Sequence, residues 1–153
     1  MYYQVTNRSN GVFRSVEAPL TVTATDITSG WYVMKEIEGG TDFDYYSLDG
    51  NKTVSSFMTT SLGMEPLKGS PVGMAFLDGS YNHEEEGADG KTTKETGLSA
   101  FHILTTHDFV TLNGSDFSLL KNLQQEFYEA PSSFNFSHLF IDSSLRAQGL
   151  NTD

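Results

Sequence analysis

Five oxygen-bearing side chains recur in one acidic stretch at the spacing of a calcium-binding loop. They are Asp78, Ser80, Asn82, Glu84 and Asp89, at positions 1, 3, 5, 7 and 12 of such a loop. Oxygen ligands at these positions converge on a hard cation when a glycine at position 6 turns the backbone sharply. His83 occupies that position here. We therefore keep calcium as an alternative ligand, and we expect the stretch to be a solvated acidic loop with no cofactor.

The residue types that carry out catalysis do not converge in the sequence. Cysteine is absent, which excludes thiol catalysis, disulfides and zinc-thiolate sites. Ser99 lacks the second glycine of a nucleophile elbow. Asp42 and Asp44 would share one face of a strand, like the carboxylate pair of a glycosidase, but no further catalytic group accompanies them. We predict no catalytic residues and a protein that is not an enzyme.

Candidate contact residues remain in two places. Glu84, Glu85 and Glu86 concentrate negative charge in the acidic stretch. Tyr45 and Tyr46 are adjacent in a predicted strand, so one ring faces each side of the sheet. We predict that these five residues contact partners, since tyrosine is enriched in interfaces and sugar sites. For Trp31, which precedes another tyrosine, we favour ordinary packing.

Composition limits the class of partner. The chain of 153 residues has a net charge of −11 and a pI near 4.6, which argues against direct binding to nucleic acid. No apolar run is long enough to span a membrane. The N-terminal residues show no signal-peptide pattern, so we expect a virion or cytoplasmic location without secretion by a signal peptide.

The chain is expected to be built around a hairpin over Pro71–Leu112. Its two apolar arms are Val72–Leu77 and Leu98–Leu104, and they flank the acidic loop of residues 78–97. Buried strands joined by a long polar segment suggest a scaffold that projects this loop outward.

Further strands are predicted from period-two runs and turn residues. They are Tyr3–Val5, Val12–Val16, Leu20–Thr25, Trp31–Ile37, Phe43–Leu48, Thr53–Thr60 and Phe134–Ile141. Strands such as Leu20–Thr25 and Phe134–Ile141 carry almost no charge, and the chain has only 9 Lys and Arg to protect sheet edges. We therefore expect such strands to pair with a neighbouring molecule.

One helix is predicted, over residues 115–131. Apolar residues recur there at three- and four-residue spacing, at Phe117, Leu120, Leu123 and Phe127. Ser115 would cap the first turn, and Pro131 would end the helix.

These patterns predict a mainly β (α+β) protein. We expect a β-sandwich or bent barrel of about eight strands with one amphipathic helix packed on it, forming a single domain over residues 1–153. This architecture is similar to that of subunits of virus and phage particles.

The expected function is that of a non-enzymatic structural or interaction protein. We expect a virus or phage particle component, such as a capsid decoration, tail or connector subunit, with protein partners and self-association into a homo-oligomer. Two alternatives remain: an acidic inhibitor that mimics nucleic acid, and a small β-domain that binds carbohydrate or calcium.

Overall fold

The chain is mainly β, as the sequence predicted. The computed structural model describes residues 2–6, 8–11, 13–17, 29–86, 89–127, 133–141 and 147–151. Among the described residues, strand accounts for about 60% and helical turns for about 8%. The strands are β1 (Tyr2–Thr6), β2 (Phe13–Glu17), β3 (Gly30–Ile37), β4 (Gly40–Ser47), β5 (Thr53–Val54), β6 (Pro71–Glu86), β7 (Thr92–Thr105), β8 (Phe109–Asn113), β9 (Leu119–Asn122), β10 (Phe136–Ile141) and β11 (Ala147–Asn151), with a π-helical turn η1 (Met58–Leu62) and a 3-10 turn η2 (Leu123–Gln125).

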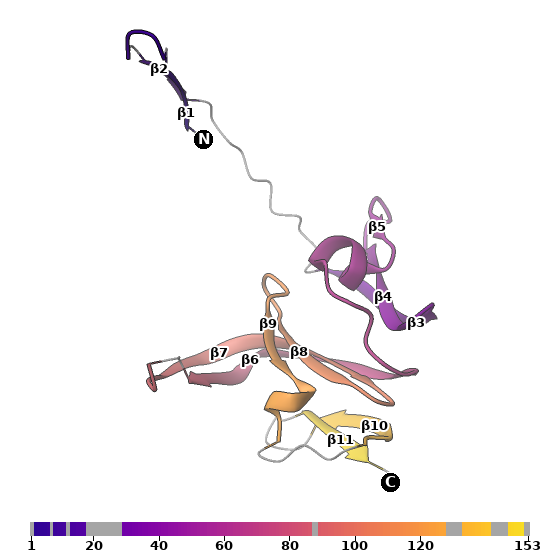
Figure 1. Ribbon diagram of the computed structural model, residues 1–153. Helices are drawn as coiled ribbons and strands as arrows, with labels where there is room; N and C mark the ends of the chain where they lie inside the picture. The colour runs from indigo at the N-terminus through magenta and orange to yellow at the C-terminus, as the bar shows by residue number, and fades with distance from the viewer. Residues whose placement is uncertain are drawn as a thin grey trace.

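The strands form four antiparallel sheets whose neighbours follow one another along the chain. Two are hairpins, β1-β2 and β10-β11, and the others are the three-stranded β3-β4-β5 and the four-stranded β6-β7-β8-β9 (Figure 1). Among the described residues no sheet closes into a barrel, so the bent-barrel alternative is wrong. The predicted strand Leu20–Thr25 lies outside the described residues.

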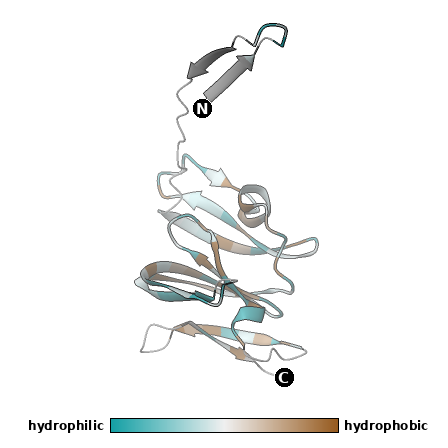
Figure 2. Cartoon of the chain, turned by 60° about the vertical axis from the view of Figure 1, so that its left-hand side comes forward, coloured by the Kyte–Doolittle hydropathy of each residue, from teal (hydrophilic) through white to brown (hydrophobic). Residues whose placement is uncertain are grey.

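The four-stranded sheet is the middle of three layers (Figure 2). One of its faces packs against β3-β4-β5 and η1, and the other packs against β10-β11. Strand β7 is accordingly buried at every position from Ala100 to Thr105. A strand buried on both faces is expected to be a continuous apolar run, and β7 reads Ala-Phe-His-Ile-Leu at this point.

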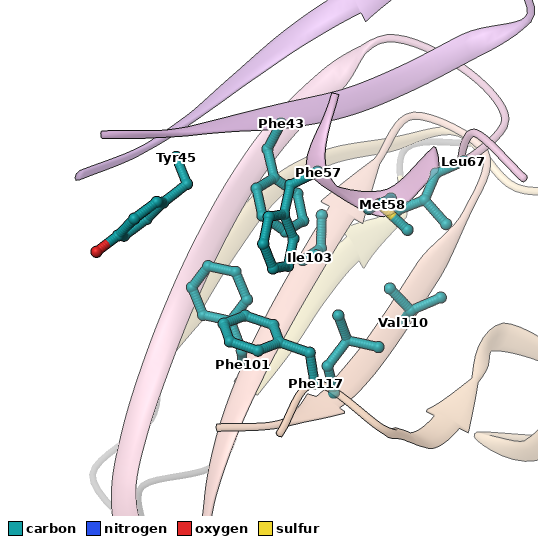
Figure 3. Close-up of a cluster of buried hydrophobic side chains, with 10 residues drawn as sticks. Phe43, Tyr45, Phe57, Met58, Leu67, Phe101, Ile103, Val110 and Phe117 are labelled. Atoms are coloured by element: carbon teal, nitrogen blue, oxygen red, sulfur yellow. The ribbon is translucent and has the colours of Figure 1, made fainter. Parts of the chain in front are cut away.

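Aromatic rings fill the first interface (Figure 3). Phe43 stacks on Phe57 with ring centroids 5.2 Å apart, and Phe57 meets Phe117 edge to face at 5.1 Å. Phe101 meets both Phe43, at 5.8 Å, and Phe117, at 5.9 Å. Each ring buries roughly 150–250 Å², so a few of them supply a core for a chain with few branched aliphatic residues.

The predicted helix over residues 115–131 is wrong. Its first residues form the turn between β8 and β9, its middle is β9 and η2, and residues 128–131 lie outside the described residues. Asn113 accepts a hydrogen bond from the Ser115 N–H at 2.9 Å, and Asp116 accepts one from the Ser118 N–H at 2.9 Å. Such local bonds favour turns over helix, and Phe117 has a left-handed φ of 60°.

A helical turn occurs instead where a strand was predicted. Of the predicted strand Thr53–Thr60, only Thr53–Val54 pairs with β4, and η1 begins at Met58. Gly63 ends this turn with a φ of 65°, a conformation that glycine adopts without strain.

The predicted acidic loop of residues 78–97 is also wrong in its extent, because most of it is paired strand. Strand β6 continues to Glu86 and β7 begins at Thr92, and the pairing runs as far as Glu86 opposite Thr92. Register shifts between Leu77 and His83 interrupt the ladder. Pairing of β7 with β8 reaches only to Ala100. On the N-terminal side of Ala100, β7 is paired with β6 alone, and these two strands extend past the rest of the sheet (Figure 1). We call residues 78–97 the acidic arm.

Two nearby leucines test the placement of the core. Leu123 is 5% exposed and packs with Leu104 and Phe136, whereas Leu119 is 48% exposed. We expect Leu123→Ala to lower the free energy of unfolding by about 2–5 kcal/mol, because it leaves a cavity. Leu119→Ala should cost less than about 0.5 kcal/mol. Urea denaturation measures both, and equal costs would contradict the assignment of Leu123 to the core.

Candidate interaction surfaces

The acidic arm is a two-stranded ribbon that carries its charge in the open. Glu84, Glu85 and Glu86 are exposed, as is the facing strand from Thr92 to Gly97. Glu84 accepts a hydrogen bond from Lys94 at 2.6 Å, which lowers the pKa of its carboxyl. A two-stranded ribbon without a third strand is marginally stable in water. The predicted contact residues Glu84–Glu86 are therefore accessible to solvent.

The structure does not bring the five candidate calcium ligands together. Four of them lie along β6, where residues two apart are separated by about 7 Å. Asp78 accepts a hydrogen bond from Ser99 at 2.7 Å, and Asp89 pairs with Lys91 at 3.3 Å. Within the described part of the chain, no three His, Asp or Glu side chains are placed to hold a metal. The loop geometry that calcium requires is replaced by strand pairing.

The outer face of β3-β4-β5 exposes large apolar side chains. Trp31 is 68% exposed, Val33 50% and Tyr46 39%, and Trp31 lies directly opposite Tyr46 in the strand register. The expectation that Trp31 packs in the core is therefore wrong. Tyr46 is accessible as predicted, whereas Tyr45 is not: it is 1% exposed, and its hydroxyl donates to the Ser29 carbonyl at 2.9 Å. We call the surface formed by Trp31, Val33 and Tyr46 the aromatic face.

A polar cluster adjoins the aromatic face. The Asp44 Oδ1 lies 2.6 Å from the Lys35 Nζ and also accepts hydrogen bonds from the Ser56 N–H at 2.8 Å and the Ser55 hydroxyl at 3.1 Å. Burial raises the pKa of Asp44, but the hydrogen bonds from Lys35, Ser56 and Ser55 outweigh it and lower the pKa below its ordinary value. Asp44 is therefore an ionised acceptor at neutral pH.

The period-two pattern of the sequence indicates which face of this sheet is exposed. Trp31, Val33 and Lys35 share one parity along β3, and the charge of Lys35 marks their face as the solvated one. Asp44 and Tyr46 share a face of β4 in the same way. The shared parity of Trp31 and Lys35 therefore indicates that Trp31 is exposed.

Asp42 is buried and stabilises the start of η1. It is 1% exposed and accepts hydrogen bonds from the N–H groups of Phe43, Met58 and Thr59, at 2.7, 2.9 and 3.2 Å. The Thr59 hydroxyl donates to it at 2.9 Å. Asp42 thus satisfies amides at the start of η1, while Asp44 is engaged with Lys35.

His102 is a buried histidine that the sequence did not single out. It is 3% exposed, and its Nδ1 lies 3.0 Å from the Thr111 hydroxyl. Its ring stacks on Phe109 at 5.9 Å and meets Tyr81 edge to face at 5.6 Å. No described group hydrogen-bonds its Nε2. Burial lowers the pKa of His102 to about 4, so the ring is neutral in the folded protein.

Two cavities adjoin the central sheet, and the walls of the first are mainly apolar, whereas those of the second are mixed. One, of about 220 Å³, is lined by Gly30, Tyr32, Phe76, Phe101, Gly114 and Phe117. The other, of about 190 Å³, is lined by Leu104, Phe109, Leu123, Glu126, Phe127, Phe136 and Gly149. Glu126 is the one charged group among these linings, and it pairs with Lys121 at 3.5 Å. Neither set of described walls brings together a nucleophile, a base and an oxyanion donor.

No known protein-family model, curated protein or solved structure matches the chain. Among the described residues, neither helical turn has the length or the apolar character that crossing a bilayer requires. The case for a function therefore rests on the geometry of the arm and of the aromatic face.

The role of Asp42 is testable by removing its side chain. Asp42→Ala would leave the buried N–H groups of Met58 and Thr59 without an acceptor, so we expect a loss of about 3 kcal/mol of unfolding free energy. Asp44→Ala removes a more exposed ion pair and should cost about 1 kcal/mol. Urea denaturation of both variants compares the two carboxylates. A cost for Asp42→Ala no larger than that for Asp44→Ala would contradict the assignment.

The burial of His102 predicts a pH dependence of stability. Its pKa is about 4 in the folded chain, against about 6.5 in the unfolded chain, so between these values only the unfolded chain binds the proton. This contribution is complete above pH 6.5 and is lost as the pH falls through 4, by about 3 kcal/mol at most.

We expect His102→Gln to reduce the loss of unfolding free energy between neutral and acidic pH. The exposed His138→Gln should leave that loss unchanged. Denaturant titrations at a series of pH values measure it. Parallel pH profiles for wild type and His102→Gln would contradict the burial argument.

Proposed function

We propose that this protein is a non-enzymatic structural subunit that works as one copy among many in a larger assembly. A virus or phage particle is the assembly that fits best, with the protein as a capsid decoration, tail or connector subunit. Its location would then be the virion, or the cytoplasm before assembly. The observation that carries the proposal is the acidic arm, a charged ribbon that extends beyond the packed layers (Figure 1).

The arm supports this proposal because it has little reason to be ordered in an isolated chain. Its outer described residues are exposed on both strands, and its ion pair between Glu84 and Lys94 is a surface pair that contributes little to stability. Its strands also present unpaired edges, which proteins normally cover, charge or pair. Strand addition by a neighbouring molecule would satisfy those edges.

The distribution of charge favours a protein partner. With a net charge of −11, the chain would be repelled by a phosphate backbone. Glu84, Glu85 and Glu86 alternate between the two faces of the ribbon, as consecutive strand residues do. A mimic of nucleic acid would need its carboxylates spread along one face. The arm suits a groove that contacts both of its faces and carries basic side chains.

A variant with a shortened arm separates assembly from folding. His83 pairs with Glu95, so residues 84–94 can be replaced by a two-residue Asn-Gly turn that closes the hairpin at that pair. We expect the variant to unfold cooperatively, with stability close to that of wild type, because the described residues among those removed are exposed. We also expect it to lose the concentration-dependent mass increase that wild type shows in light scattering.

Charge provides the matched control for this experiment. Replacing Glu84, Glu85 and Glu86 by glutamine keeps both strands. This variant should assemble as wild type does if the partner binds the arm by strand pairing, and its assembly should weaken if the partner binds the arm through a basic groove. Either result is compatible with a role for the arm. A wild-type chain that stays monomeric at all concentrations and does not co-sediment with assembled particles would contradict the proposal.

A further inference from the structure

We propose that the aromatic face of β3-β4-β5 binds a neutral carbohydrate, with Trp31 and Tyr46 as the stacking platform and Asp44 and Lys35 as the hydroxyl-binding pair. This site lies on a different sheet from the acidic arm. It adds a ligand-binding activity to the proposed structural role and does not depend on it.

The platform consists of two rings on adjacent strands. Trp31 on β3 and Tyr46 on β4 are direct cross-strand partners, so both side chains leave the sheet on the same face. At 68% and 39% exposed, both rings are accessible. The apolar face of a pyranose ring packs on such flat aromatic surfaces, and large rigid rings bind with little loss of side-chain entropy.

The polar pair lies one step along the same face. Asp44 is two residues from Tyr46 on β4, about 7 Å away, and it pairs with Val33 in the register. Its Oδ1 is occupied by Lys35, Ser55 and Ser56, whereas from the described part of the chain its Oδ2 accepts only a long bond, from the Tyr46 hydroxyl at 3.3 Å. Oδ2 therefore keeps acceptor capacity toward a hydroxyl placed over Tyr46.

Lys35 supplies the matching donor. Its Nζ bonds Asp44 at 2.6 Å and the Ser55 hydroxyl at 2.8 Å, and an ammonium group has three N–H donors. These bonds hold the side chain in place before a ligand arrives, which lowers the entropy cost of binding. A sugar hydroxyl can donate to the Asp44 Oδ2 and accept from the Lys35 Nζ at the same time.

The chemistry selects a neutral glycan over the alternatives. The paired charges of Lys35 and Asp44 offer no net attraction to an ion, and the net charge of −11 repels an acidic polysaccharide. An apolar protein surface would remove water from the Asp44 Oδ2 without replacing its hydrogen bonds, which is unfavourable. A ligand that combines an apolar ring face with equatorial hydroxyls satisfies both halves of the surface.

The experiment uses the intrinsic fluorescence of the intact chain. Trp31 is the single tryptophan, so its emission reports occupancy of the face directly. Cellohexaose and chitohexaose are the probes, and heparin is the anionic control. We expect at least one of the two neutral oligosaccharides to shift the emission saturably, with an affinity of about 1 mM or tighter, and heparin to leave it unchanged.

Variants test which residues bind the oligosaccharide. Binding to them is measured by saturation-transfer NMR, because Trp31→Ala removes the fluorophore. Trp31→Ala should weaken binding at least about tenfold, and Asp44→Asn should weaken it with the fold intact by circular dichroism. Leu48→Ala changes an equally exposed residue outside the face and should bind as wild type does. The shortened-arm variant should also bind unchanged, which separates this site from assembly. No binding of either probe, or binding that survives Trp31→Ala, would overturn the proposal.

Discussion

The burial of β7 on both faces is the constraint on which the rest of the structure depends. From Ala100 to Thr105 its side chains point alternately into two separate cores, so neither face tolerates solvent. Side chains of β4 and η1, with Phe57 just before η1, cover one face, and β10 with η2 covers the other. His102 is buried for the same reason, and its ring stays neutral because burial disfavours the charged form and lowers its pKa.

The same strand explains why the arm lacks support. On the side of Ala100 that leads to Thr92, pairing of β7 with β8 ends, while the pairing of β6 with β7 continues. At the base of the arm Tyr81 is half-buried against His102, whereas the outer described residues are exposed and are held mainly by the pairing of β6 with β7. One strand therefore links a stable interior to an exposed, charged ribbon, and this arrangement is the physical basis for proposing a subunit of a larger assembly.

Local patterns predicted the strands well and failed where distant residues decide. The runs at Trp31–Ile37 and Leu98–Leu104 specify strands by themselves, and both were found. The spacing of Leu120 and Leu123 fits a helix equally well, but turns at Asn113 and Asp116 and pairing with β8 override it. Turn η1 depends on Asp42, 16 residues before Met58, which no local window includes. Of the candidate contact residues, Glu84–Glu86 and Tyr46 are accessible. The polar pair Lys35–Asp44 could not be predicted without knowing the register between β3 and β4.

Hydrogen exchange of backbone amides tests most directly whether the arm is stabilised by a partner. We predict that amides of β7 from Ala100 to Thr105 are protected at every protein concentration, because they lie within the packed layers. Amides from Thr92 to Gly97 should exchange fast in dilute protein and gain protection as assembly proceeds. Arm amides that exchange at the same rate in dilute and assembled protein would contradict the claim that the arm is the contact.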